Sequence, residues 1–203
     1  MDTNTKLLVD FEFKALSGYR MNLRAAARGY WSGDLDYMDF FTIMQSAIQK
    51  GFREAWAEGA GAYGIKPDEY TDKERIRLQQ EINKEVGFVD RLATFVERHS
   101  KANKGKLTIV FQRMEVWAKG YNKIVQIART YAGGDKKLRW SLNVAEHCRS
   151  CLKLNGKVKR ASYWLEHDVY PKHWDKLECR GGCKCELNDT DEPLSKGPLP
   201  SLP

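Results

Sequence analysis

The residues best suited to chemistry in this 203-residue chain are its five cysteines, which fall in two groups near the carboxyl end. The first group is Cys148-x2-Cys151, and the second is Cys179-x3-Cys183-x-Cys185. Two separated groups of thiols are what one tetrahedral zinc ion requires, because each group can donate from a tight turn. We therefore expect a structural zinc ion bound by four of the five cysteines, and the spacing leaves open which one is surplus.

Disulfide bonds are the alternative use of such cysteines in a secreted protein. Residues 1–16 carry several charged side chains and no long apolar run, so we expect no signal peptide. Thiols stay reduced in the cytosol, which favours metal binding over disulfides. His147 and His173 are the alternative ligands, although His147 directly precedes Cys148 and adjacent residues seldom bind the same ion.

The segments before the cysteines are predicted to be helical. Apolar residues recur at the spacing of one helix face over residues 6–30, 37–56, 71–98 and 107–131. Thr71-x-x-Glu74 is a capping box that marks the start of the third helix. Short connections predict that neighbouring helices run antiparallel, and their wide apolar stripes also suit contacts with other subunits, so an oligomer is allowed.

Two details of these helices bear on function. Opposite the apolar face formed by Leu7, Leu8, Phe11 and Ala15, the first helix carries a basic stripe of Arg20, Arg24 and Arg28. Such a stripe can contact DNA or an acidic neighbour, but it is more often the wet side of a helix. The glycine-rich run from Gly59 to Gly64 lacks the Gly-Lys-Ser/Thr of a phosphate-binding loop, so we expect a hinge or close backbone packing.

After Gly134 the pattern changes to short strands, predicted at residues 138–142, 157–159 and 184–187. Such strands form no core alone, so a metal ion would stabilise them. The predicted fold is mainly α: long antiparallel helices followed by a small zinc-stabilised β-hairpin module. The predicted domains are a helical domain (1–135), a cysteine-rich zinc-binding module (136–187) and a disordered proline-rich tail (188–203).

The formal net charge of +7 is concentrated around the cysteines. Residues 136–187 hold 12 Lys and Arg against 6 Asp and Glu, whereas residues 1–135 hold 21 against 18. A basic surface favours nucleic acid or another acidic partner, although a solvated basic face explains the same excess. No apolar run approaches the length of a membrane-spanning helix, so no membrane partner is expected.

The order of residues through the cysteine-rich region resembles a known family signature. It reads Trp140 … His147-Cys148-x2-Cys151-Leu152-x-Leu154-x-Gly156 … Pro171 … Cys179-x3-Cys183-Lys184-Cys185-x-Leu187. This is similar to the carboxyl-terminal signature of the bacteriophage Mu F-type head morphogenesis proteins, in which a Trp-bearing strand leads into Cys-x-x-Cys, a Leu-x-Gly turn and a closing Cys-basic-Cys pair. Many members carry Pro-x-His-Pro before that pair; here Cys179 stands near the place of that His, and Lys184 replaces the commoner Arg.

The resemblance implies a structural minor head protein of a tailed phage or prophage. Such proteins are present in few copies and associate with portal and inner capsid proteins. They accompany the DNA during packaging or ejection. The implied location is the virion, at the capsid interior or portal vertex, after assembly in the host cytoplasm. The implied partners are portal and capsid proteins, together with non-specific contacts to double-stranded DNA, and no catalysis is required.

Two other readings stay open. One is a zinc-containing nucleic-acid-binding protein, which the basic charge permits but which no recognition-helix spacing supports. The other is an HNH-like nuclease, suggested by Glu166-His167-Asp168-Val169-Tyr170-Pro171. There Pro171 stands four residues after His167 instead of three, and no paired downstream His with a suitable Asn follows. We therefore expect no enzyme.

Overall fold

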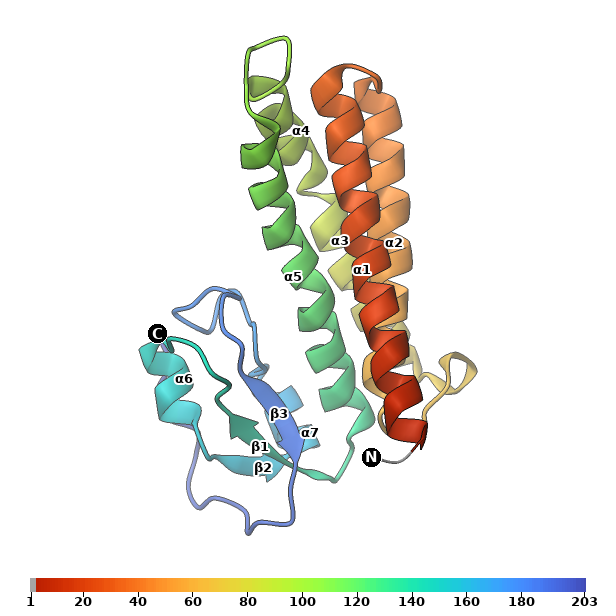
Figure 1. Cartoon of the computed structure of the whole chain (residues 1–203). Coiled ribbons are helices and arrows are strands. Elements are labelled where there is room, and N and C mark those ends of the chain that lie inside the picture. Colours follow the sequence, from red (N-terminus) through yellow and green to blue (C-terminus); the bar gives the residue numbers. More distant parts are fainter. Residues whose placement is uncertain (1–2) are drawn as a thin grey trace. The chain divides into compact units, whose positions relative to one another are not determined.

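The computed structural model describes the backbone of residues 3–203 and the side chains from residue 15 onward (Figure 1). The predicted apolar face of Leu7, Leu8 and Phe11 lies outside the described side chains. Helices dominate the chain: α1 (Thr3–Ser32), α2 (Tyr37–Gly61), η1 (Pro67–Glu69), α3 (Asp72–Val86), α4 (Val89–Arg98), α5 (Leu107–Ala132), α6 (Arg149–Leu154) and α7 (Ala161–Glu166). The predicted mainly helical class is confirmed.

The chain divides into two compact units. Unit 1 contains Met1–Ala55 and Thr71–Tyr121, and unit 2 contains Trp56–Tyr70 and Asn122–Pro203. The division falls inside α2 and α5, whereas the predicted boundary lay at residue 135. The sequence suggested residue 135 because the helical spacing stops there, but compactness depends on which residues pack together. The second unit therefore includes the last turns of both helices.

Unit 1 is a helical core built on the predicted apolar stripes. Phe40, Met44, Ile48 and Phe52 recur at helical spacing along α2 and are fully buried. In unit 1, α1 and α2 run side by side in opposite directions after a short connection (Figure 1). Tyr19 of α1 packs between two other rings, with centroids 6.3 Å from Phe52 and 6.0 Å from Tyr121. The hydrophobic stripes therefore account for how these helices associate.

The third predicted helix is two helices in the structure. Its start is confirmed, because Glu74 N–H donates to Thr71 Oγ1 (3.3 Å) and Thr71 N–H donates to Glu74 Oε2 (2.8 Å). α3 then ends at Gly87, whose N–H donates to Asn83 O at 3.0 Å, and α4 begins at Val89. Glycine adds no side-chain packing and has a high entropy cost in a helix, which makes it the natural breaking point.

The basic stripe of α1 faces α5 within unit 1. Arg20 Nε lies 3.1 Å and Arg24 Nη2 lies 2.9 Å from the carboxylate of Glu115. The guanidinium groups of Arg24 and Arg28 lie over the ring of Phe111, at 5.2 and 5.4 Å. Arg20 and Arg24 remain about 40% exposed. The stripe is thus not simply exposed to solvent, because its arginines also contact Glu115 and Phe111 of α5.

Unit 2 contains a three-stranded antiparallel sheet. The strands are β1 (Lys137–Ser141), β2 (Val158–Arg160) and β3 (Glu186–Asp189), in the order β2-β1-β3. All three predicted strands are present, but the module is a sheet centred on β1 with two short helices, not a simple hairpin. Trp140 pairs with Leu187 across β1 and β3, and both are buried. This sheet carries the segments that hold the cysteines.

The segment after β3 differs from the predicted disordered tail. Ser195 N–H donates to Val158 O (2.9 Å), and Ser195 Oγ accepts from Val158 N–H (3.0 Å). The ammonium group of Lys159, a residue only 7% exposed, donates to the carbonyls of Ser195 and Gly197 at 2.8 and 2.5 Å. The tail therefore lies along the free edge of β2. The composition of the tail did not predict this contact, because the donor that binds the tail, Lys159, belongs to β2 and not to the tail.

Replacing Gly59 with Ala should destabilise unit 2. A Cβ at Gly59 would lie 2.4 Å from Val125 O and 2.7 Å from Ala128 Cβ, so α2 and α5 approach too closely there for any side chain. The glycine-rich run thus provides the predicted close packing at this position. We expect Gly59→Ala to lower the free energy of unfolding by about 1–3 kcal/mol, as overpacking does. Urea denaturation of purified variants measures this.

Gly61 provides the matched control for this change. No atom lies within 4 Å of the place where its Cβ would be, although it belongs to the same helix. Gly61→Ala should be neutral or stabilise by up to about 1 kcal/mol, because alanine favours helix over glycine. Equal effects of the two variants would contradict the packing explanation.

Candidate metal centre

The first cysteine pair is placed by the start of α6. Cys148 occupies the position before the helix, and Cys151 lies one turn along it and is buried. The end of α6 is fixed to the sheet, because Gly156 N–H donates to Trp140 O at 2.9 Å. Gly156 has a φ of 73°, a left-handed conformation that glycine adopts without strain. The Leu-x-Gly turn noted in the sequence therefore anchors this helix to β1.

Cys179 lies in a tight turn that follows Leu177. Arg180 N–H donates to Leu177 O (2.9 Å), and Gly182 N–H donates to Cys179 O (2.8 Å). This turn is linked to α6 by a reciprocal pair that the sequence analysis missed. Glu178 N–H donates to Ser150 Oγ at 3.2 Å, and Ser150 N–H donates to Glu178 Oε2 at 3.3 Å. The two cysteine-bearing segments are therefore held together by hydrogen bonds as well as by their thiols.

The second pair, Cys183 and Cys185, precedes β3 directly, and both side chains are buried. Their position follows from the pairing of β3 with β1, which also brings Leu187 opposite Trp140. Leu187 N–H donates further to Gln126 Oε1 of α5 at 3.2 Å, a buried contact within unit 2. The strand thus fixes the backbone immediately after the last two thiols.

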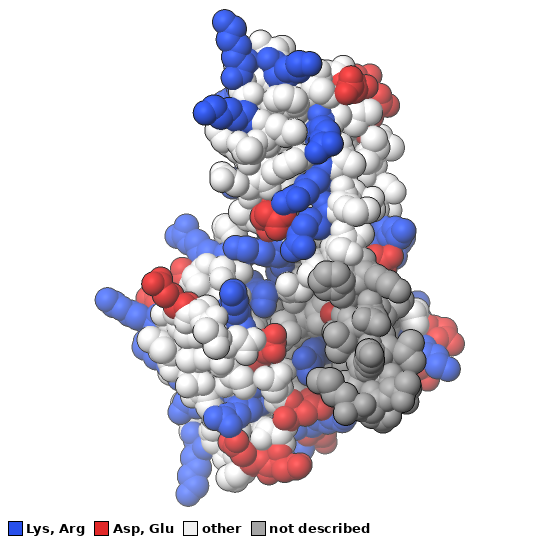
Figure 2. Space-filling model, in the orientation of Figure 1, with Lys and Arg blue, Asp and Glu red and all other residues white. Residues whose placement is uncertain are grey.

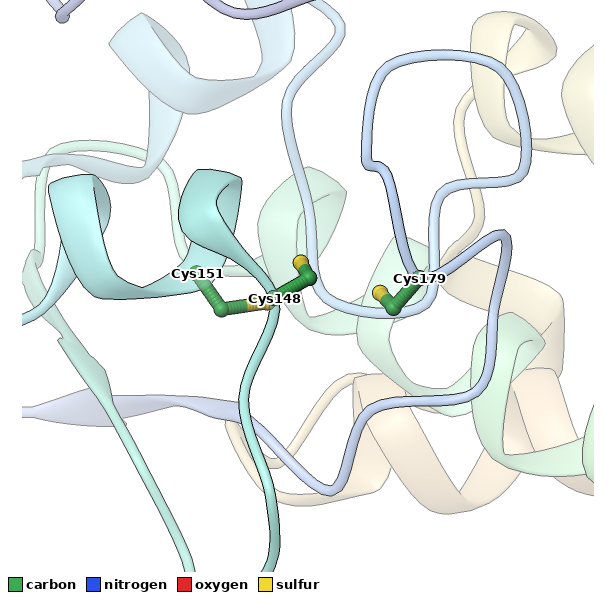
Figure 3. A group of neighbouring side chains, drawn as sticks. All are labelled: Cys148, Cys151 and Cys179. Atoms are coloured by element: carbon green, nitrogen blue, oxygen red, sulfur yellow. The ribbon is translucent and has the colours of Figure 1, made fainter.

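The structure brings all five predicted ligands together. The sulfurs of Cys148, Cys151 and Cys179 lie within 4.8 Å of one another, and so do those of Cys151, Cys183 and Cys185. Figure 3 shows the first of these groups: Cys148 and Cys151 come from the start of α6, and Cys179 approaches from its loop. Cys151 belongs to both groups. Within the described chain none of the five forms a disulfide.

The close packing of thiols shifts the pKa values of neighbouring cysteines in opposite directions. Hydrogen bonds from Cys151 first, and also from Cys179 and Cys185, lower the pKa of Cys183 far below that of a free thiol. Hydrogen bonds with Cys179, Cys183 and Cys185, in that order, raise the pKa of the Cys151 thiol. A thiol cluster that stabilises thiolate is chemically suited to a cation, because metals bind the deprotonated form.

The two alternative histidine ligands, His147 and His173, differ in their position relative to the cysteines. His147 Nδ1 lies 3.7 Å from Cys185 Sγ, and its Nε2 lies 2.7 Å from Asn143 O, so it borders the cluster. His173 Nδ1 accepts from the N–H groups of Asp175 and Lys176, and its Nε2 donates to Asp168 Oδ2 at 3.1 Å. His173 is therefore occupied in a turn and offers no free nitrogen for the metal.

His167, the candidate nuclease residue, is held within its own helix. Its Nδ1 lies 2.9 Å from Tyr163 O, and its ring stacks on that of Tyr163 at a centroid distance of 4.0 Å. Both contacts are local to α7 and explain the position of the ring without any substrate.

Taken together, unit 2 is a small α/β module with a largely buried cluster of five cysteines, a type of site that can hold a soft metal ion. Comparison of the chain with protein-family models, curated proteins and solved structures finds no match. Among the helices of the described residues, none has a stretch long and apolar enough to span a bilayer. The geometry of the site is therefore the main guide to its role.

Proposed function

We propose that the cysteine cluster binds one structural zinc ion that stabilises unit 2. The observation that carries this proposal is the gathering of thiols from three separate segments around Cys151. Sulfur ligands favour zinc over magnesium or calcium, which prefer oxygen. An all-cysteine shell has no open position for a reactant, so the ion would support the fold and not catalysis.

The zinc content of freshly purified protein tests this proposal directly. We expect about one zinc per chain by elemental analysis, since the five thiols form one cluster and a tetrahedral ion uses four. The protein should be purified without added metal or chelator, so that zinc is neither introduced nor removed before the measurement. A content well below one equivalent would count against the site.

We further propose that the protein is a structural minor head protein of a tailed phage or prophage, associated with portal and inner capsid proteins. Support comes from the resemblance of the cysteine-rich signature and from the roles of its residues. Trp140 and Leu187 pair across the sheet, and Gly156 turns the chain back onto β1. The signature residues thus serve one folded module, as a family signature of a structural protein should.

Particle composition tests this second proposal. Phage particles produced from the genome that encodes the chain should contain it in the head fraction in few copies, detected by mass spectrometry. A portal gene next to its gene should also be found. Absence from highly purified heads that contain portal and capsid proteins would overturn the proposal.

Two DNA assays separate this role from the alternatives. Incubation of DNA with the protein and Mg²⁺ should give no cleavage, and His167→Ala should behave like wild type. Cleavage that disappears in His167→Ala would favour the nuclease. Binding to mixed-sequence DNA that weakens steeply with salt would indicate phosphate contacts. Figure 2 shows Lys and Arg interspersed with Asp and Glu on the viewed face, so we expect only weak, non-specific binding.

A further inference from the structure

The basic stripe of α1 is a row of guanidinium groups that the zinc site does not explain. Arg20, Arg24 and Arg28 follow one another at intervals of one helical turn, and residues 15–32 of α1 contain no Asp or Glu. The three residues span about 12 Å along the helix axis, because each residue adds about 1.5 Å. The charge count over residues 1–135 does not show this row, because most acidic residues of that stretch lie between residues 34 and 97.

Contacts with α5 hold the basic stripe in place. The guanidinium groups of Arg20 and Arg24 share the carboxylate of Glu115, at N–O distances of 3.1 and 2.9 Å. Those of Arg24 and Arg28 lie over the ring of Phe111. Side chains that are already fixed lose less conformational freedom when they bind a partner. Because two arginines share one carboxylate, the stripe keeps a surplus of positive charge.

Lysines extend the positive charge at both ends of the stripe. Lys119 is exposed and lies one turn beyond Glu115 on the same side of α5. At the other end, Lys101 N–H donates to Trp31 O at 2.9 Å, which brings exposed Lys101 and Lys104 to the end of α1. On the face shown in Figure 2, Lys and Arg gather between α1 and α5, although both signs of charge occur elsewhere on it.

We propose that this basic face, formed by the basic stripe with Lys101, Lys104 and Lys119, binds the phosphate backbone of double-stranded DNA. Protein interfaces are centred on aromatic and other large apolar side chains. Here two guanidinium groups cover the aromatic ring of Phe111. DNA interfaces are more polar and far more positively charged, and a row of cations complements a row of phosphates. Contacts with phosphates do not read the base sequence, so the binding is weak and non-specific.

The basic face belongs to unit 1 and contains none of the cysteines. Removal of zinc or absence of the protein from phage heads would therefore leave this binding unchanged. Its failure is distinguishable from the failure of either function proposed above.

A pair of arginine variants in the full-length protein tests the basic face. Binding of a fluorescent, mixed-sequence DNA duplex is followed by anisotropy at salt concentrations of roughly 50 to 200 mM. Arg24→Gln/Arg28→Gln should weaken binding. It should also make the dependence of log K on log salt less steep by about 2, since each lost phosphate contact lowers the slope by about 1.

Arg91→Gln/Arg113→Gln is the matched control. These two arginines also belong to unit 1 and also lie over aromatic rings, those of Phe88 at 4.6 Å and Phe95 at 5.8 Å. The control loses the same charge and the same type of ring contact outside the basic face, so its salt slope should match that of wild type. Equal effects of the two pairs would mean that net charge alone binds DNA, and the proposed face would be wrong.

Two further variants separate charge from folding. Arg24→Lys/Arg28→Lys should keep the salt slope, because lysine binds phosphate as a point charge. Glu115→Gln should tighten binding at low salt, because it removes the carboxylate that the stripe shares. If circular dichroism shows that the glutamine pair does not fold, Glu115→Gln decides, and unchanged or weaker binding by this variant would refute the proposal.

The wild-type protein supplies the last comparison. It should bind DNA at about 50 mM salt more tightly than it binds polyglutamate, an acidic polypeptide without phosphates. Tighter binding of polyglutamate would assign the face to an acidic protein, and no binding of DNA at this salt concentration would also overturn the proposal.

Discussion

Chelation of zinc should unfold the cysteine-bearing part of unit 2 and leave the helices of unit 1 intact. All five cysteines lie within residues 122–203 of unit 2, and unit 1 contains none. Structural zinc contributes roughly 10 kcal/mol or more in small peptides, which exceeds the stability of a few short strands. Unit 1 is stabilised by buried side chains such as Phe40 and Met44, which do not depend on metal.

Hydrogen exchange measured by mass spectrometry resolves this outcome by region. Exchange should rise sharply in residues 138–187 after chelation, with little change in α1 and α4, and the helical circular dichroism should fall only modestly. Re-adding zinc should restore protection, whereas Mg²⁺ should not, because thiolates bind it poorly. Loss of most helical signal on chelation would show that the two units are not independent in this way.

The periodic features of the fold could be predicted from sequence because each depends on local spacing. Phe40, Met44 and Ile48 recur every three to four residues, so their helix and its buried face were evident. The alternation around Trp140 likewise predicted β1. The gathering of the cysteines followed from chemistry, since separated thiols have few common uses other than metal binding or disulfides.

Features that depend on contacts between distant residues could not be predicted. The hydrogen bonds of Ser150 with Glu178 join segments 28 residues apart, and neither residue belongs to any pattern. Ser195 lies along β2 because Lys159 donates to its carbonyl, yet the composition around Ser195 is typical of a disordered segment. The division of the chain inside α5 could not be predicted from spacing either, because the helical pattern continues across it.

The cysteine cluster was predictable in part: its members could be identified from the sequence, but their contacts could not. Spacing identified the whole group but not its internal contacts, because Cys-x2-Cys, Cys-x3-Cys and Cys-x-Cys pairs can each bind one ion. The structure adds that Cys151 belongs to both close groups, a property that no spacing contains.

Trp164→Ala should destabilise unit 2 strongly even when zinc is saturating. Trp164 is fully buried and packs against Trp140, with ring centroids 5.8 Å apart at 45°. Its indole N–H donates to Leu138 O at 3.2 Å. Truncation of a buried Trp leaves a large cavity and removes the hydrogen bond to Leu138 O, so we expect a loss of about 3–5 kcal/mol in the free energy of unfolding. Urea denaturation followed by near-ultraviolet circular dichroism measures this loss.

Trp174→Ala is the matched control, because Trp174 lies in the same unit but is 52% exposed. We expect a change within about 0.5 kcal/mol for this variant, as for most surface substitutions. Trp164→Phe should fall between the two, because it keeps much of the apolar volume but loses the bond to Leu138. Similar losses for Trp164→Ala and Trp174→Ala would mean that the metal, and not the paired tryptophans, determines the stability of this unit. A large difference at saturating zinc would instead show that the ion and the apolar core stabilise the sheet separately.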